Sequence, residues 1–110
     1  VYSIERNRSL LLTTDARIRE LRINNVTTRW GDGIEGWPEQ APFSRIIVSA
    51  AVSQVPQALL DHKADGGIMI VPVGETEREQ ILYRFRRIGN EFEQERLIQV
   101  RFLPLVLGLP

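Results

Sequence analysis

The sequence contains no cysteine among its 110 residues and only one histidine, His62. The lack of cysteine excludes disulfide frameworks, thiolate zinc sites and cysteine nucleophiles, and it is consistent with a reducing cytoplasm. No cluster of Asp and Glu has the spacing of metal ligands, and no second histidine could complete one. The sequence therefore predicts no metal site and no catalytic residue, and we interpret His62 as a solvated cation near the end of a helix.

The sequence also lacks net charge and long apolar segments. It has 14 Lys and Arg residues against 14 Asp and Glu residues, which disfavours a nucleic-acid binder that relies on bulk positive charge. No apolar run approaches the ~18 residues that suggest a transmembrane helix, and no signal peptide is recognisable. We therefore expect neither a nucleic-acid partner nor a membrane partner.

Length and composition are typical of one globular domain. Hydrophobic residues make up 43% of the sequence and charged residues 25%, which is ordinary for a soluble protein, and the length is sufficient for a hydrophobic core. The chain starts at Val1, without Met, inside an apparent strand. Because a strand with nothing before it is a poor start for a parallel sheet, we expect residues 1–110 to be the carboxyl-terminal part of a single longer domain.

Hydrophobic periodicity predicts strands that alternate with helices. The expected elements, in order, are a strand at 1–4, a helix at 6–22, a strand at 26–30, a loop at 31–41, a strand at 44–51, a helix from 56 to 61 or 63, a turn at 64–67, and strands at 68–73, 80–88 and 92–103. This alternation favours an α/β fold with a mostly parallel sheet. The Gly89-Asn90 pair between the last two strands is a signal for an antiparallel hairpin.

Two segments have patterns that indicate burial. In the first expected helix, residues at spacings of four, four and three form one face, namely Leu10, Thr14, Ile18 and Leu21. The run Ile46–Val48 is continuously apolar, which is typical of a strand buried on both faces of a parallel sheet.

The expected hairpin carries positive charges on one strand and negative charges on the other. Its first strand has Arg84, Arg86 and Arg87 interleaved with aromatic residues, and its second has Glu91, Glu93 and Glu95. Arginines next to aromatic residues can bind single-stranded nucleic acid. Because the glutamates lie just across the turn, a cross-strand ladder of opposite charges is the favoured interpretation.

Two carboxylates follow two successive expected strands. Glu5 ends the first strand, and Asp32 lies in the Gly31-Asp32-Gly33 turn after the second. Open α/β sheets bind ligands at the carboxyl ends of their strands, and two acids suit the polar edges of a nucleoside. The residues alone also allow simpler roles, because Glu5 could be a favourable charge in the first turn of a helix and the glycines could form an ordinary turn.

Four motifs in fixed order resemble a known family. They are VYSIER, then NVTTRWGDGIEGWPEQAPFSRIIVSAA, then PQALLDHKADGGIMIVPVG, and finally VRFLPL. Together they are similar to protein-L-isoaspartate O-methyltransferase over essentially all 110 residues. The resemblance implies a Rossmann-like, S-adenosylmethionine-dependent methyltransferase sheet, mostly parallel with a carboxyl-terminal antiparallel hairpin, of which this chain is a partial domain.

The resemblance also implies an activity. The family methylates the free carboxylate of isoaspartyl residues in damaged proteins, so isoaspartyl-containing peptides or proteins would be the partners and the cytoplasm the compartment. Residues Val100–Leu105 resemble the strand that lies near the substrate peptide in the family.

The residues that would hold S-adenosylmethionine follow from the same motifs. By resemblance, Glu5 would accept hydrogen bonds from the two ribose hydroxyls, with Arg6 alongside. The loop after the second strand would hold the edge of the adenine through Asp32, Gly33 and Ile34.

The chain departs from the family pattern at several points. It contains neither the glycine-rich loop E-x-G-x-G-x-G nor a segment like T-I-S-x-P. Ser44 stands where the family usually has Asp, and Val52-Ser53-Gln54 replaces a more usual turn. We therefore expect the chain alone to bind cofactor poorly and to be inactive. Two alternatives remain, a catalytically silent methyltransferase-like binding or structural module, and a methyltransferase of similar fold that acts on a different acceptor.

Overall fold

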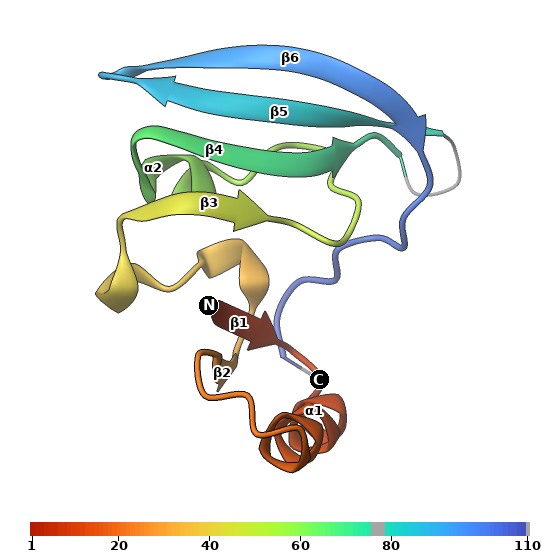
Figure 1. The fold of residues 1–110 in the computed structure, drawn as a ribbon. Helices are drawn as coiled ribbons and strands as arrows, with labels where there is room; N and C mark the ends of the chain where they lie inside the picture. Colours follow the sequence, from red (N-terminus) through yellow and green to blue (C-terminus); the bar gives the residue numbers. More distant parts are fainter. Residues whose placement is uncertain (76–78, 110) are drawn as a thin grey trace. The chain divides into compact units, whose positions relative to one another are not determined.

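The computed structural model describes residues 1–75 and 79–109, which form two compact units (Figure 1). Unit 1 comprises Val1–Gly36 together with the residues from Leu107 onward, and unit 2 comprises Trp37–Val106. Unit 1 contains β1 (Tyr2–Glu5), α1 (Arg8–Glu20), β2 (Thr27–Trp30) and the 3₁₀ turn η1 (Gly33–Glu35). Unit 2 contains η2 (Pro38–Gln40), β3 (Phe43–Ile47), α2 (Gln57–Asp61), β4 (Lys63–Val73), β5 (Gln80–Ile88) and β6 (Glu91–Val100). The expected α/β class is confirmed.

Unit 1 is a β-α-β arrangement in which β1 and β2 pair in parallel (Figure 1). The register runs from Tyr2 opposite Thr27 to Glu5 opposite Trp30. Helix α1 begins after Asn7, whose side chain accepts a hydrogen bond from the Leu10 amide at 3.1 Å. Because Asn is among the best N-cap residues, the helix starts at Arg8 rather than at the predicted residue 6.

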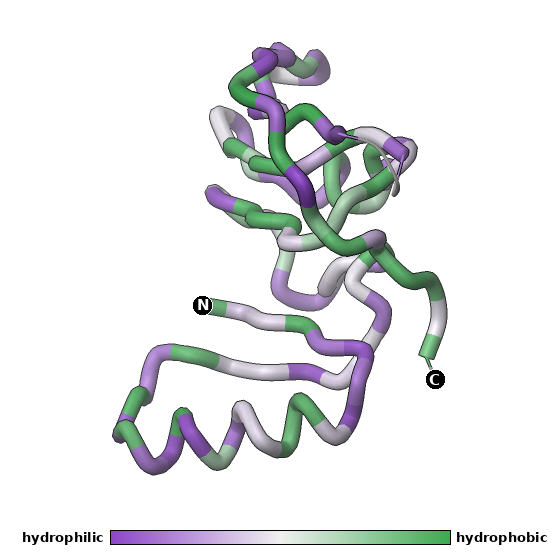
Figure 2. Tube along the Cα trace, turned by 90° about the vertical axis from the view of Figure 1, so that its right-hand side faces the viewer, coloured by the Kyte–Doolittle hydropathy of each residue, from purple (hydrophilic) through white to green (hydrophobic). Residues whose placement is uncertain are grey.

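The inner face of α1 differs from the predicted face. Leu11 is the buried residue of the helix, whereas Leu10 and Leu21 are 56% and 69% exposed. The physical reason lies at Asp15, one turn after Leu11, which accepts a hydrogen bond from the Thr28 hydroxyl of β2 at 2.5 Å. Figure 2 shows hydrophobic and hydrophilic residues intermixed along α1, so hydropathy alone does not identify the face that packs.

Unit 2 is a four-stranded sheet in the order β3-β4-β5-β6, with α2 against one face. Strands β3 and β4 pair in parallel, while β4-β5 and β5-β6 pair antiparallel. The sheet is therefore mixed, partly parallel and partly antiparallel. Its core combines Leu59 of α2 with residues of the sheet and of the segment that precedes the helix, namely Val52, Met69, Val71 and Phe85.

Two details of the sheet differ from the sequence prediction. The predicted turn at 64–67 lies within β4, where the pairing with β3 shifts between Phe43–Lys63 and Arg45–Ile68, and Gly66 in that irregular stretch has φ +73°.

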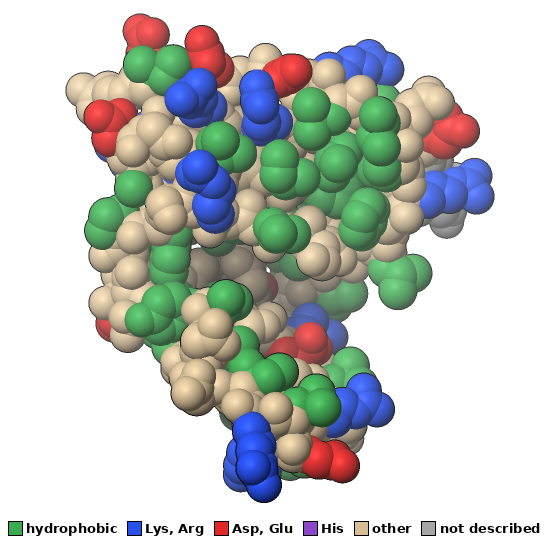
Figure 3. All heavy atoms as spheres, viewed as in Figure 1, with side chains coloured by type: hydrophobic (Ala, Val, Ile, Leu, Met, Phe, Trp, Pro, Cys, Tyr) green, Lys and Arg blue, Asp and Glu red, His purple; other side chains and the backbone are tan. Residues whose placement is uncertain are grey.

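The second difference concerns Ile47, which is 77% exposed rather than buried. It is on an edge strand of this sheet, and pairs with Ile70 on the face opposite the buried Met69. Figure 3 shows hydrophobic side chains gathered on the surface over β3–β6.

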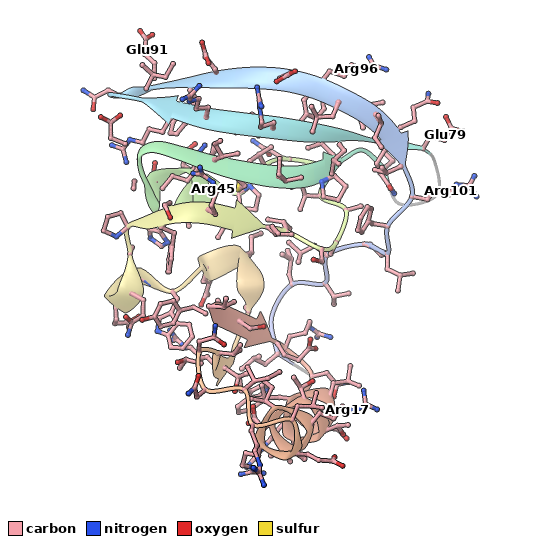
Figure 4. All side chains as sticks on the ribbon, viewed as in Figure 1. Arg17, Arg45, Glu79, Glu91, Arg96 and Arg101 are labelled. Atoms are coloured by element: carbon pink, nitrogen blue, oxygen red, sulfur yellow. The ribbon has the colours of Figure 1, made fainter. Side chains whose placement is uncertain are left out.

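The predicted hairpin is confirmed, and its charge ladder is confirmed in part, because Arg87 lies opposite Phe92 and Glu91 lies opposite Ile88. Strands β5 and β6 flank Gly89-Asn90, Arg84 forms an ion pair with Glu95, and Arg86 lies opposite Glu93. Glu91 and Arg96 extend from β6 away from the other strands (Figure 4). Strand β6 ends at Val100, earlier than the predicted residue 103.

The environment of His62 differs from the predicted solvated cation. His62 follows the last turn of α2, and its Nδ1 atom is buried without a hydrogen-bond partner in the described part of the chain. Helices in the described ranges are all too short or too polar to cross a bilayer.

Candidate functional site

The two predicted acids lie at the same edge of the parallel pair in unit 1. Glu5 is the last residue of β1 and is opposite Trp30, the last residue of β2. The pairing continues one step further, because the Gly31 amide donates to the Glu5 carbonyl oxygen at 3.1 Å. Asp32 follows directly, so both carboxylates begin the loops at the carboxyl ends of adjacent parallel strands. That edge is where open α/β sheets bind ligands.

The Glu5 carboxylate is half-buried and only partly used by the protein. Its Oε1 atom accepts a hydrogen bond from the Asn7 amide at 3.0 Å, and nothing among residues 1–75 and 79–109 is found to donate to Oε2. An ionised carboxylate has two oxygens with about four acceptor positions. Glu5 can therefore accept further hydrogen bonds from a ligand while it holds the start of α1.

Arg6 and Trp30 connect the two loops through the backbone. The indole Nε1 of Trp30 donates to the carbonyl oxygen of Arg6 at 2.9 Å, and the Arg8 guanidinium lies 5.6 Å from the centre of the Trp30 ring. The hydrogen bond from Trp30 holds the end of β2 against Arg6, the residue that follows Glu5.

Asp32 has its orientation set by two backbone amides. It caps η1 by accepting from the Ile34 amide through Oδ1 at 3.1 Å. Its Oδ2 atom accepts from the Gly108 amide at 2.8 Å. Since each carboxylate oxygen can accept about two hydrogen bonds, each oxygen retains acceptor capacity. Hydrogen bonds to an ionised group are stronger than neutral ones, so the side chain is well positioned.

Gly33 leaves open space beside Asp32. A Cβ atom built at Gly33 would meet no heavy atom within 4 Å, and its φ lies outside the left-handed region. By contrast, Gly36 at the end of η1 has φ +65°, a conformation that favours glycine. Neither packing nor backbone conformation in the described chain requires glycine at 33. The free space is what the close approach of a flat ligand to the backbone would need.

Sequence reasoning missed Gly108. Its carbonyl oxygen accepts a hydrogen bond from Arg6 Nε at 2.9 Å, in addition to the bond from its amide to Asp32. Gly108 lies near the end of the chain and belongs to no motif. It is 102 positions from Arg6 and 76 positions from Asp32 in the sequence, and only the fold brings it to them. The structure thus joins Arg6 and Asp32 through a residue that the sequence did not single out.

The predicted substrate-side segment, Val100–Leu105, lies in unit 2. The buried side chain of Gln80 holds it by accepting from the Phe102 amide at 2.7 Å and donating to the Phe102 carbonyl at 3.3 Å. Further along, the Leu105 amide donates to Ala51 at 2.8 Å. These hydrogen bonds to its backbone fix the segment at Phe102 and Leu105.

Comparison with known proteins places these motifs in one family. The family model described as protein-L-isoaspartate(D-aspartate) O-methyltransferase matches residues 1–109. A protein-L-isoaspartate O-methyltransferase from Parvibaculum lavamentivorans is 52% identical over 111 aligned positions, which cover 99% of this chain and 50% of the relative. One from Idiomarina loihiensis is 49% identical, with 98% of this chain and 51% of the relative covered. The chain spans about half the length of the curated relatives it matches.

Solved structures show the same fold. A structure described as protein-L-isoaspartate O-methyltransferase superposes with a TM-score of 0.89 at 28% identity, covering 98% of this chain and 34% of that one. A Plasmodium falciparum protein assigned to the same family, solved in complex with S-adenosyl-L-homocysteine, superposes with a TM-score of 0.81 at 27% identity. That match covers 96% of this chain and 52% of the other.

Proposed function

This chain belongs to the protein-L-isoaspartate O-methyltransferase family, and on that premise we propose that the complete protein transfers a methyl group from S-adenosylmethionine to the free carboxylate of L-isoaspartyl residues in damaged proteins. The observation that carries the proposal is the site in unit 1. Two half-buried carboxylates, Glu5 and Asp32, lie at the carboxyl ends of adjacent parallel strands, next to open space at Gly33.

The residues of the site fit the adenosine part of this cofactor. The unused acceptor capacity of Glu5 Oε2 suits the two ribose hydroxyls, with the Arg6 side chain alongside. Asp32, Gly33 and Ile34 suit the edge and face of adenine, because a carboxylate can accept from an amino group and glycine leaves the backbone accessible. When bound, S-adenosylmethionine supplies an electrophilic methyl group on a sulfonium centre.

The chemistry needs little from the protein beyond position. A free carboxylate has a pKa near ~4 and is already an anion at neutral pH, so its attack requires no general base. Proximity and alignment can supply effective molarities of ~10⁵ M or more. His62 is therefore not needed as a catalyst, and the role left to Glu5 and Asp32 is to hold the methyl donor rigidly.

Three further assignments belong to the same proposal. Both units form part of one methyltransferase domain, which is supported by a family model that matches residues 1–109. Residues Val100–Leu105 form part of the binding surface for the substrate peptide. The absence of cysteine supports a cytoplasmic location, which fractionation of the native cells would test.

The direct test is a methyl-transfer assay with the complete gene product. We expect the methyl group of labelled S-adenosylmethionine to be transferred to a peptide that contains one L-isoaspartyl residue. The matched control is the same peptide with an ordinary aspartyl residue, which should remain unlabelled, because only the geometry of the carboxylate differs between the two.

Each alternative function has its own outcome in this assay. Binding of S-adenosylmethionine without transfer to any acceptor would contradict the enzymatic proposal and favour a catalytically silent binding module. Transfer to other acceptors, but not to the isoaspartyl peptide, would show a methyltransferase of different specificity. Labelling of both peptides to the same extent would remove the isoaspartyl assignment.

Gly33→Ala provides a test of the proposed adenine position. The added methyl group meets no protein atom within 4 Å, so the free energy of unfolding should stay within about 0.5 kcal/mol of the parent value. If adenine occupies that space, the same methyl group costs about 1–3 kcal/mol of overpacking, which corresponds to at least about a fivefold loss of cofactor affinity.

Calorimetric titration with S-adenosylhomocysteine and urea unfolding of the same sample measure the two effects of Gly33→Ala separately. Ala16→Gly on α1 is a useful comparison, because it should lower stability by about 0.5–1 kcal/mol without a change in affinity. Unchanged affinity in Gly33→Ala would place adenine elsewhere.

A further inference from the structure

We propose that Gly108 is a positioning residue of the cofactor site, and that its backbone ties Arg6 and Asp32 together so that both side chains face S-adenosylmethionine in a fixed orientation. This inference rests on the proposed function and names a part of the same site that the motifs do not include. The three residues all belong to unit 1.

The tie consists of two hydrogen bonds that involve a single residue. The Gly108 amide donates to Asp32 Oδ2 at 2.8 Å, and the Gly108 carbonyl oxygen accepts from Arg6 Nε at 2.9 Å. One partner in each bond is an ionised group, which makes both bonds stronger than neutral backbone bonds. Arg6 follows β1 and Asp32 follows β2, so Gly108 links the two loops that carry the proposed ligand contacts.

The tie leaves both side chains able to bind a ligand. Asp32 uses one acceptor position of each oxygen, for the amides of Ile34 and Gly108, and a carboxylate has about four such positions. Arg6 uses Nε alone for Gly108, which leaves the terminal guanidinium donors. A segment that blocked the site would be expected to use the groups that the ligand needs, whereas this one leaves them available. Positioning is therefore favoured over competition.

The conformation of Gly108 explains why glycine stands there. Its φ is +72°, and an added Cβ would meet nothing within 4 Å. An alanine would therefore fit in space but would be strained in the backbone, because residues with a side chain rarely adopt this conformation. Asparagine tolerates the left-handed region much better than alanine. Gly108→Ala should displace the tie, and Gly108→Asn should largely retain it.

A second glycine in the chain offers a closely matched control. Gly89 has φ +59° with open space around its Cβ position. Its amide donates to Asp65 Oδ1 at 2.9 Å and its carbonyl oxygen accepts from Arg87 Nε at 2.8 Å. Gly89 therefore shares with Gly108 a left-handed backbone conformation and hydrogen bonds to one Asp and one Arg side chain. It differs in position, because it lies in unit 2 at the tip of the β5–β6 hairpin.

The experiment compares the complete gene product with its Gly108→Ala, Gly108→Asn and Gly89→Ala variants. Calorimetry gives the dissociation constant for S-adenosylhomocysteine, and steady-state assays give the KM for S-adenosylmethionine and for an isoaspartyl peptide. We expect Gly108→Ala to raise the dissociation constant and the cofactor KM by about 3- to 10-fold, through lost preorganisation, with the peptide KM unchanged. Gly108→Asn should restore most of the loss, and Gly89→Ala should have the parent affinity.

The outcomes separate this inference from the proposed function. If Gly108→Ala binds as tightly as the parent, or more tightly, while a Glu5 variant loses affinity, the proposed function stands and the positioning role is wrong. If Gly108→Ala and Gly89→Ala lose cofactor affinity equally, the loss reflects a general effect on stability, and the positioning role of Gly108 is again wrong. If neither the Glu5 variant nor Gly108→Ala changes cofactor affinity, the site itself is wrong and the inference falls with it.

Discussion

Glu5→Gln should weaken the binding of S-adenosylmethionine to the complete protein by about 10- to 100-fold. A hydrogen bond to a charged group contributes about 1.5–3 kcal/mol, and about 1.4 kcal/mol corresponds to a factor of ten in affinity. The glutamine has one acceptor oxygen where the glutamate has two, and that oxygen can still accept from the Asn7 amide, as Glu5 Oε1 does at 3.0 Å. The ribose hydroxyls would then lose their charged acceptor while the start of α1 is retained.

Glu20→Gln is the matched control for this prediction. Glu20 is the exposed last residue of α1, in the same unit as Glu5, and the same exchange removes one negative charge there. Isothermal titration of both variants with S-adenosylmethionine distinguishes a local contact from a general effect of charge. The proposed role of Glu5 would be refuted if the two variants lost affinity equally, or if Glu5→Gln bound like the parent.

The second large effect should be an increase in the stability of unit 2 as the pH rises above 8, and its source is Lys63. This side chain is fully buried, with 0% exposed surface. Its Nζ atom donates to the Phe85 carbonyl oxygen at 3.0 Å and lies 4.8 Å from the centre of the Phe92 ring. Burial, with a smaller contribution from the nearby Arg87 charge, lowers the pKa of Lys63 from 10.5 to about 8.

The direction of the effect follows from proton linkage. Below pH 8, Lys63 is protonated in both the folded and the unfolded chain, so the full cost of burying the charge is present. Between pH 8 and 10.5 the unfolded chain binds more protons than the folded chain, so the free energy of unfolding rises with pH. At 1.36 kcal/mol per pKa unit, the gain from Lys63 should be about 2 kcal/mol by pH 9.5 and about 3 kcal/mol at completion.

Lys63→Met tests this prediction because methionine has a similar length and no charge. Urea unfolding of the parent protein and of Lys63→Met at intervals from pH 7 to 9.5 gives the free energy of unfolding of each. Because all other titrating groups are the same in the two proteins, their contributions cancel when one free energy is subtracted from the other. We expect that difference to shift in favour of the lysine protein by about 2 kcal/mol across the range. A difference that is independent of pH would mean that Lys63 keeps an ordinary pKa in the folded protein.

Much of the element order could be predicted from local patterns. The strand at residues 26–30, the strand at residues 80–88 and the Gly89-Asn90 turn were expected and are present to within one or two residues. Strands and turns of this kind are determined by side chains a few positions apart, so their signals can be read directly. The placement of Glu5 and Asp32 at the ends of parallel strands follows from the same reasoning, because Glu5 ends the first expected strand and Asp32 follows the second after one glycine.

Packing directions were harder to predict than the elements themselves. The inner face of α1 is rotated by one residue from the expected face, since Asp15 packs toward β2 through its bond to Thr28 while Leu10 is exposed. Similarly, a continuous apolar run in β3 predicted burial on both faces, yet Ile47 is exposed. The orientation of Asp15 depends on the hydrogen-bond partner that β2 supplies, and the exposure of Ile47 depends on the place of β3 at the edge of the sheet.

By itself, the sequence determined the fold class, the family and the positions of Glu5, Arg6, Asp32, Gly33 and Ile34 in motifs that follow two strands. Only the tertiary structure decided that Gly108 joins Arg6 to Asp32, and that Lys63 is buried near two aromatic rings. The physical reason is the range of the interactions. Periodicity and turn propensity act over a few residues, whereas the bond from Arg6 to Gly108 spans 102 positions and forms only when the chain has folded.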